Sequence, residues 1–117
     1  YSLHGDGELQ EGQNWEAIMY AAGNNIDNLI ATVDLNGQQI DGATDDVLPM
    51  GNLKAKFEAF GWMVIEINEG NNIEAIIEGM KLANQSRETY LRSSKNSYGQ
   101  RCRFYDAYTR VARQSTK

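Results

Sequence analysis

The sequence predicts an α/β protein that contains part of a doubly wound, mostly parallel sheet. Short apolar runs alternate with segments whose apolar residues recur at helical spacing. The turn Gly5-Asp6-Gly7 follows the first apolar run, and the second run ends in Asp34-Leu35-Asn36-Gly37. Loops that follow parallel strands emerge at the same edge of the sheet, where ligands bind. We therefore expect Asp6 and Asn36 to lie close together.

The first half of the chain predicts strand, turn, helix and strand in that order. Residues 1–3 have the character of the end of a buried strand. Residues 13–22 are expected to form a helix that ends at Gly23-Asn24-Asn25, and residues 29–33 form a continuous apolar run typical of a central parallel strand. The helix is expected to face the core through its residues at i, i+3, i+4 and i+7, which are Trp15, Ile18, Met19 and Ala22.

The second half continues the alternation. Residues 45–49 are expected to be a connection, 52–60 a helix, 62–67 a strand and 72–83 a second helix. The apolar faces of the two helices are predicted from helical spacing. They comprise Leu53, Phe57 and Phe60 in the first helix, and Ile73, Ile76, Ile77 and Met80 in the second.

Length and composition predict at most one domain, with enough residues for a real core. The sequence has no long apolar span and no visible signal peptide, so we expect no membrane partner. Its single cysteine, Cys102, excludes an internal disulfide and is consistent with a reducing, cytoplasmic location. Because the chain starts with Tyr1, we expect it to begin inside a larger reading frame.

The chemistry expected at the shared sheet edge is cofactor binding through Mg2+. This ion prefers six oxygen ligands and usually takes few from the protein, sharing the others with phosphates and water. Asp6 offers a carboxylate oxygen, Asn36 an amide oxygen, and a main-chain carbonyl just past Gly37 a third. The glycines of the Gly5-Asp6-Gly7 turn allow a diphosphate to approach the backbone closely.

Other motifs match these residues less well. A nicotinamide-type GxGxxG turn would need glycine where Gln10 stands. A calcium loop starting at Asp34 would need glycine at its sixth position and glutamate at its twelfth, but glycine stands at the fourth and Asp45 at the twelfth. A plain strand–helix–strand unit, in which the glycines only make turns, is the remaining alternative.

The stretch from Gly5 to Gly42 resembles the thiamine-diphosphate motif of the transketolase family. The Gly-Asp-Gly turn, the spacing to Asn36, and the residues Glu11-Gly12, Glu16-Ala17 and Ile40-Asp41-Gly42 are similar to transketolase itself, including the amino-terminal subunit of split transketolases. The resemblance covers residues 1–83. It implies a partial thiamine-diphosphate-binding fold over these residues.

The resemblance also implies roles for individual residues. Gly5, Asp6, Gly7, Asn36 and Ile40 would bind the cofactor, with Ile40 packing beneath the thiazolium ring or only stabilising its own loop. The metal ligands would be the Asp6 carboxylate, the Asn36 side chain and the main-chain carbonyl of Gln38. The candidate catalytic residues are Glu11, at a subunit interface in a proton relay between active sites, and Glu16 in the same acidic neighbourhood.

Two alternatives stay open for other residues near the turn. The acidic side chains of Glu11 and Glu16 could instead only favour the dipole of the helix that starts there. His4 either touches the cofactor or packs beside the turn.

The parent protein implied by the resemblance is a cytoplasmic transketolase of the pentose phosphate pathway. It would transfer a two-carbon ketol unit from a ketose phosphate to an aldose phosphate, with thiamine diphosphate and Mg2+ as cofactors. Its partner would be the pyrimidine-binding domain or the carboxyl-terminal subunit, in a dimer or heterotetramer. We expect the isolated chain to be inactive. The alternatives are a non-catalytic thiamine-diphosphate-fold module and, among enzymes, a dihydroxyacetone synthase.

The charge balance changes sharply near residue 84. Residues 1–83 carry three basic and fourteen acidic side chains, a balance of −11, whereas residues 84–117 carry eight basic and two acidic ones, a balance of +6. Neither helical nor strand periodicity is visible after Ala83. We expect residues 84–117 to be a basic tail that is out of frame or disordered.

A one-nucleotide slip near residue 84 would explain this tail. Codons for residues 88–114 exist which, read one nucleotide later, spell K-P-T-C-V-L-L-K-T-V-M-G-N-G-V-D-F-M-M-H-T-H-A-W-H-G, an apolar strand, a glycine turn and histidines. Resequencing the coding DNA from codon 75 onward tests this. The alternative is a real tail that binds nucleic acid or an anionic surface; the slip predicts no nucleic-acid partner.

Overall fold

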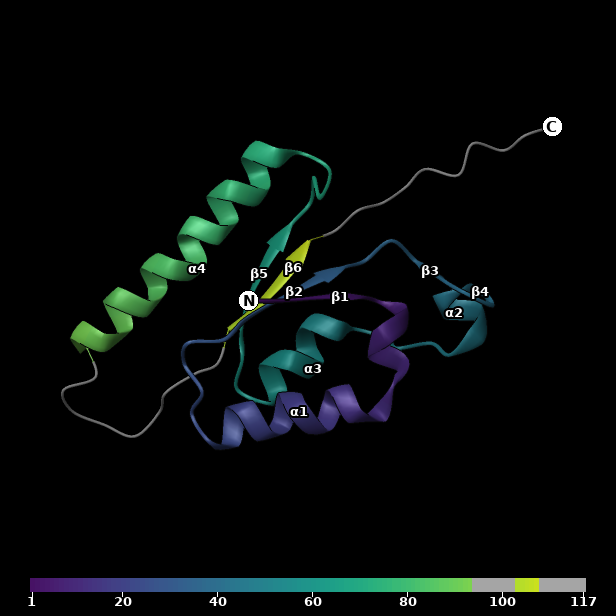
Figure 1. Ribbon diagram of the computed structural model, residues 1–117, viewed down its shortest axis with the longest axis horizontal. Coiled ribbons are helices and arrows are strands. Elements are labelled where there is room, and N and C mark those ends of the chain that lie inside the picture. The colour runs from purple at the N-terminus through teal and green to yellow at the C-terminus, as the bar shows by residue number, and fades with distance from the viewer. Residues whose placement is uncertain (94–102, 108–117) are drawn as a thin grey trace.

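The computed structural model describes residues 1–93 and 103–107, with side chains up to residue 85 (Figure 1). The first elements are β1 (Ser2–Gly5), the 3-10 helix η1 (Gly7–Gln10), α1 (Gly12–Gly23) and β2 (Ile30–Asp34). They are followed by β3 (Gln38–Gln39), β4 (Gly42–Ala43), α2 (Thr44–Val47) and α3 (Leu53–Ala59). The last are β5 (Met63–Ile67), α4 (Ile73–Ser93) and β6 (Arg103–Ala107).

The main sheet has four parallel strands in the order β1-β2-β6-β5. Strands β1 and β2 are in register so that Gly5 pairs with Asp34. The carboxyl ends of these two strands therefore lie side by side, as predicted. Strands β3 and β4 form a separate antiparallel pair, Gln38 with Ala43 and Gln39 with Gly42.

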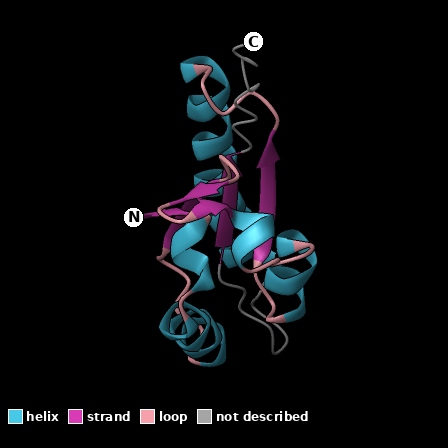
Figure 2. Ribbon diagram, turned by 90° about the vertical axis from the view of Figure 1, so that its right-hand side faces the viewer, coloured by secondary structure: helices cyan, strands magenta, loops and turns pink. Residues whose placement is uncertain are grey.

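Helices cover both faces of the sheet, so the predicted α/β, doubly wound class is confirmed (Figures 1 and 2). On one face, α1 and α3 pack against β2 in a large apolar cluster with Leu9, Ile18, Val33, Phe57 and Trp62 among its buried members. On the other face α4 packs on β2 and β5 in a smaller cluster, where Ile30, Ile67 and Ala83 are buried.

Helix α1 confirms the predicted helix but presents a slightly different face to the core. Ile18 and Ala21 are buried, and Trp15 and Ala22 pack partly against them. The predicted core contact of Met19 is wrong, since its side chain is 55% exposed. One residue along a helix is a rotation of about 100°, so Met19 falls beside the stripe that Ile18 and Ala21 define.

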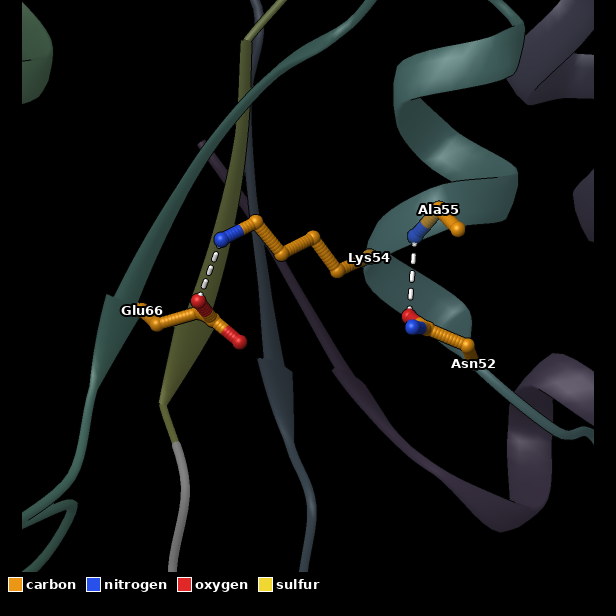
Figure 3. Close-up of polar contacts among 4 residues, drawn as sticks. All are labelled: Asn52, Lys54, Ala55 and Glu66. Atoms are coloured by element: carbon orange, nitrogen blue, oxygen red, sulfur yellow. Dashed lines mark hydrogen bonds and ion pairs between the residues drawn. The ribbon is translucent and has the colours of Figure 1, made fainter.

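Helix α3 is fixed at its start and along its side. The Asn52 side chain accepts a hydrogen bond from the Ala55 N–H at 2.9 Å, as N-cap residues do, and Lys54 forms an ion pair with Glu66 of β5 at 2.5 Å (Figure 3). This pair is partly exposed and contributes less than about 1 kcal/mol. Most of the attachment comes from Leu53 and Phe57, which are buried as predicted. Phe60, the third predicted contact, lies at the rim, 37% exposed.

The chain after residue 83 departs from expectation at two places. Helix α4 continues to Ser93, so its predicted end at Ala83 is wrong, and β6 lies between β2 and β5 where no strand was predicted. Along α4 the contacts come from Ala75, Ile76 and Met80, while Ile73 and Ile77 are exposed, contrary to prediction. The rest of the tail, residues 94–102 and 108–117, lies outside the described residues. The one-nucleotide slip in the reading frame stays a hypothesis.

Three short elements were not predicted: η1, the β3–β4 pair and α2. Residues 45–49 were expected to be a connection, but most of them belong to α2 or its end. Each element is four residues or fewer, too short for hydrophobic periodicity to be visible. All three lie beside the carboxyl ends of β1 and β2.

Candidate functional site

The centre of the candidate site is the carboxylate of Asp6, which follows β1 directly. Its side chain is 3% exposed, and its main-chain N–H donates to the carbonyl of Asp34 at 3.1 Å, continuing the pairing of β1 with β2. One carboxylate oxygen, Oδ1, accepts from the Gly7 N–H at 2.9 Å. The turn thus folds the carboxylate back over the end of the strand.

The second loop reaches the same carboxylate from β2. The Gly37 N–H donates to Asp6 Oδ2 at 2.8 Å, and the Thr44 hydroxyl donates to the same oxygen at 3.4 Å. Between these residues, Asn36 is held by two contacts of its side chain. Its Nδ2 donates to Asp34 Oδ2 at 3.1 Å, and its Oδ1 accepts from the Gln38 N–H at 2.8 Å. The structure therefore brings Asp6 and the Asn36–Gly37 turn together, although they are thirty residues apart.

Close approach of the two loops requires glycine at position 7. A Cβ placed there would stand 2.5 Å from the Gln39 Cβ and 3.6 Å from the main-chain carbonyl oxygen of Gln38. The carbonyl predicted to bind metal thus lies against the Gly5-Asp6-Gly7 turn. Gly37 adopts a φ of +72°, a conformation that glycine tolerates best, and this turns its N–H toward Asp6.

Burial is the main influence on the acidity of Asp6. It raises the pKa of the carboxyl above its ordinary value, and the hydrogen bonds from Gly37, Gly7 and Thr44 lower it in part. The nearby carboxylate of Asp34 raises the pKa further. A cation bound to Asp6 would remove the cost of keeping this charge buried, because an opposite charge favours the ionised form.

The donor set fits a hard, oxygen-binding cation. A carboxylate oxygen can accept two hydrogen bonds, and Asp6 Oδ1 accepts one in the structure, as does the Asn36 amide oxygen. With the Gln38 carbonyl they offer three protein oxygens, which leaves places for phosphate and water around Mg2+. Within residues 1–85 no cluster of three His, Cys, Asp or Glu side chains could hold a metal. The predicted set contains only one such side chain, so this result is consistent with it.

Three predicted site residues lie away from this network. Ile40, at the tip of the β3–β4 connection, is fully exposed. Glu11 is exposed at the start of α1, where its side chain makes no capping hydrogen bond, and Glu16 is exposed on the same helix. The side chains of these three residues therefore take no part in the network around Asp6, and their predicted roles stay predictions.

His4 lines an apolar cavity of about 230 Å3 between the sheet and α1, together with Ala17, Ile18, Val33 and Phe57 among others. Neither Asp6 nor Asn36 lines this cavity. Of the two alternatives for His4, the structure favours packing beside the turn.

Sequence reasoning missed two residues of the network, Thr44 and Gln10. Thr44 is 6% exposed and contacts both loops, while the Gln10 side chain hydrogen-bonds to the ends of α2. A threonine or a glutamine carries no pattern that marks it in advance. In the sequence, Gln10 indicates only that a nicotinamide-type motif is absent.

The family described as "Transketolase, thiamine diphosphate binding domain" matches residues 1–93, which is most of the chain. The chain belongs to the transketolase family. The match includes both loops of the candidate site. It continues to residue 93, whereas the resemblance in the sequence predicts an end at residue 83.

Several curated relatives within the transketolase family are single subunits. A 6-deoxy-6-sulfo-D-fructose transketolase subunit of Clostridium sp. is 44% identical over 87 residues, 74% of this chain and 31% of that protein. An apulose-4-phosphate transketolase subunit of Actinobacillus succinogenes is 46% identical over 81 residues, 69% of this chain and 29% of that protein. The transketolase of Bacillus subtilis is 36% identical over 75% of this chain and 13% of its own length. The chain thus spans less than a third of these relatives.

Solved transketolases share the fold. Pichia stipitis transketolase in complex with sedoheptulose-7-phosphate superposes with a TM-score of 0.74 at 26% identity, covering 92% of this chain and 14% of that one. Transketolase from Campylobacter jejuni matches with a TM-score of 0.59 at 31% identity, covering 89% of this chain and 14% of that one. The partial thiamine-diphosphate-binding fold is therefore confirmed. Within the described residues, no helix is long and apolar enough to cross a bilayer.

Proposed function

We propose that this chain supplies the diphosphate- and Mg2+-binding part of a transketolase active site. The observation that carries the proposal is the convergence of two loops on the buried carboxylate of Asp6, with the Gly37 N–H at 2.8 Å and the Asn36 turn beside it. Family membership makes thiamine diphosphate the cofactor of this domain. The presence of a buried, ionisable carboxylate next to an amide oxygen supports Mg2+ as the ion that links the diphosphate to the protein.

The reaction proposed for the parent protein is transfer of a two-carbon ketol unit from a ketose phosphate to an aldose phosphate. Thiamine diphosphate, when bound, supplies the electron sink for cleaving a carbon–carbon bond beside a carbonyl. The chain's own residues bind and orient it: Asp6, Asn36 and the Gln38 carbonyl hold the metal, and Gly5 and Gly7 allow the diphosphate to approach the backbone. Ile40, which is fully exposed at the tip of the β3–β4 connection, would pack beneath the thiazolium ring when the cofactor binds.

The remaining parts of the active site would come from a pyrimidine-binding domain or a partner subunit. Two relatives named as subunits, 44% and 46% identical to this chain, support a partner of this kind. The two names specify different sugars, yet the sequence identities of the two relatives to this chain are almost equal. The similarity therefore supports a shared cofactor role for the segment, and we propose that other parts of the protein select the sugar.

Removal of the metal ligands tests this function. In the full-length protein with its partner, Asp6→Ala or Asn36→Ala is expected to abolish Mg2+-dependent binding of thiamine diphosphate in calorimetry, and ketol transfer with it. Glu58→Ala, which removes an exposed carboxylate from α3, is the control and should bind as the wild type does. If Asp6→Ala or Asn36→Ala bound thiamine diphosphate with the wild-type dependence on Mg2+, the proposed assignment of the metal ligands would be wrong. Cofactor binding by the wild type without ketol transfer would instead favour a non-catalytic module.

A further inference from the structure

The side chain of Gln10 joins two segments that lie far apart in the sequence. Its amide nitrogen donates to the main-chain carbonyl of Thr44 at 3.0 Å and to that of Leu48 at 2.9 Å. Thr44 begins α2 and Leu48 follows its last residue. Gln10 thus contacts the two ends of one short helix from the end of η1.

Both contacts require the nitrogen of the amide rather than its oxygen. The two partners are main-chain carbonyls, which only accept hydrogen bonds, and a glutamine NH2 group has two N–H donors for them. The reversed orientation would place three oxygens together. A residue of the same length without N–H donors could not make either bond.

Helix α2 buries little apolar surface that could keep it in place. It is four residues long, and the two apolar side chains at its carboxyl end, Val47 and Leu48, are 43% and 51% exposed. Isolated helices of this length are not stable in water, and burial of apolar surface contributes little here. Hydrogen bonds from outside the helix therefore have a large share in fixing its position.

Thr44 connects α2 to the metal-binding residues. Its N–H donates to the carbonyl of Gly37 at 3.1 Å, and its hydroxyl donates to Asp6 Oδ2 at 3.4 Å. Gln10 holds the carbonyl of the same residue. A continuous set of hydrogen bonds thus runs from Gln10 through Thr44 to Asp6 and to the Gly37 turn.

We propose that Gln10 is a positioning residue for the Mg2+ and diphosphate site, acting through Thr44 and α2 rather than by touching the ligand. This inference rests on the proposed function and deepens it. Without the two hydrogen bonds from Gln10, α2 opens more often, Thr44 leaves Asp6, and the second loop is less often in the arrangement that binds the ion.

The test compares Gln10→Met with Gln13→Met in the full-length protein with its partner subunit. Methionine matches the length of glutamine but has no N–H donors, and Gln13 is a solvent-exposed glutamine on α1. In the cofactor-free protein, hydrogen exchange of the amides of Thr44 and Leu48 should become about tenfold faster in Gln10→Met, the effect of losing one or two such bonds. Exchange in β2 should not change. Gln13→Met should match the wild type.

The second readout separates positioning from a general loss of structure. Gln10→Met should raise the Mg2+ concentration for half-saturation about tenfold, while the turnover number at saturating Mg2+ returns to the wild-type value. Unchanged exchange and unchanged half-saturation in Gln10→Met would overturn the inference. Should this variant not fold, Gln10→Lys keeps N–H donors at this position: normal Mg2+ dependence supports the inference, and a tenfold increase contradicts it.

A wrong proposed function can be distinguished from a wrong inference about Gln10. If the proposed function is wrong, the wild-type protein binds no thiamine diphosphate at any Mg2+ concentration. The exchange measurement uses no cofactor, so it would still decide whether Gln10 holds α2.

Discussion

The two loops at the carboxyl edge of the sheet are stabilised in different ways. The first, residues 5–11, is held by the core: Leu9 is 1% exposed, and its carbonyl accepts a hydrogen bond from Trp15 Nε1 at 2.7 Å. The second, residues 36–48, is held by several hydrogen bonds to residues of the first loop. Gly37 and Thr44 both donate to Asp6, and Gln10 holds both ends of α2.

This difference indicates an order of dependence. The first loop is folded when the core is folded, because a buried leucine and an indole hydrogen bond fix it there. The second loop is then placed on the first by polar contacts, and its tip at Ile40 extends into solvent. A change in the first loop should therefore disturb both loops, whereas a change at the tip of the second should disturb only what the tip contacts.

The largest effect is expected from Gly7→Ala. The new Cβ would stand 2.5 Å from the Gln39 Cβ, closer than such atoms come, so the loops must separate. We expect Mg2+-dependent affinity for thiamine diphosphate to fall at least about 100-fold and the free energy of unfolding to fall by about 1–3 kcal/mol. Calorimetry and urea unfolding measure the two quantities. The control is Gly12→Ala, at the start of α1, where a Cβ meets nothing within 4 Å. Equal behaviour of both variants would show that the loops need not touch.

A medium effect is expected from the charge of Asp6, the group on which both loops converge. Burial raises its pKa, so the folded state binds this proton more tightly than the unfolded state does. This contribution to stability is present at low pH and is lost as the pH rises through the raised pKa. Without metal, the wild type should therefore gain stability relative to Asp6→Asn as the pH is lowered, by up to about 1.4 kcal/mol per pH unit.

Urea unfolding of both proteins between neutral and acidic pH measures this difference. Saturating Mg2+ should remove the trend, because the ion competes with the proton for the same oxygen. A difference that stays constant with pH, or one that grows toward neutral pH, would contradict the burial argument for Asp6.

A smaller structural effect is expected from Glu11→Gln at the end of the first loop. The Glu11 side chain is exposed and makes no capping hydrogen bond, so stability should change by less than about 1 kcal/mol, through the helix dipole alone. If Glu11 belongs to a proton relay, ketol transfer slows at least about tenfold while cofactor affinity is unchanged. Stopped-flow kinetics and calorimetry separate the two. Glu74→Gln, in the first turn of α4, is the matched control. Full activity of Glu11→Gln would leave Glu11 without a catalytic role.

The smallest effect on the fold is expected from Ile40→Ser. Its side chain is fully exposed, so the free energy of unfolding should change by no more than about 0.5 kcal/mol. Any loss of cofactor affinity would then come from the loss of a contact between Ile40 and the cofactor. Such a loss would support the predicted place of Ile40 beneath the thiazolium ring. A large loss of stability would mean that the tip of the second loop is held by the protein after all.

The larger elements could be predicted because their sequences carry long patterns. The helix around Ile18, the strand before Asp34 and the helix around Phe57 each combine helical or continuous apolar spacing with clear ends. Met19, Ile73 and Ile77 were wrongly predicted to be buried. The spacing of apolar residues gives the period of a helix, but it defines the width and the centre of the buried stripe only to within about one residue. The continuation of α4 and the strand β6 were missed because these segments show no periodicity in the sequence.

The sequence by itself determined the family, the α/β class and the two turns that carry Asp6 and Asn36, because glycine, carboxylate and amide occur there at a characteristic spacing. Tertiary structure decided how the two turns meet. Parallel pairing aligns Gly5 with Asp34, the missing Cβ of Gly7 lets Gln39 approach, and Thr44 and Gln10 complete the network around a buried charge. Contacts of this kind join residues about thirty or more positions apart and depend on the angle between loops, which no local pattern encodes.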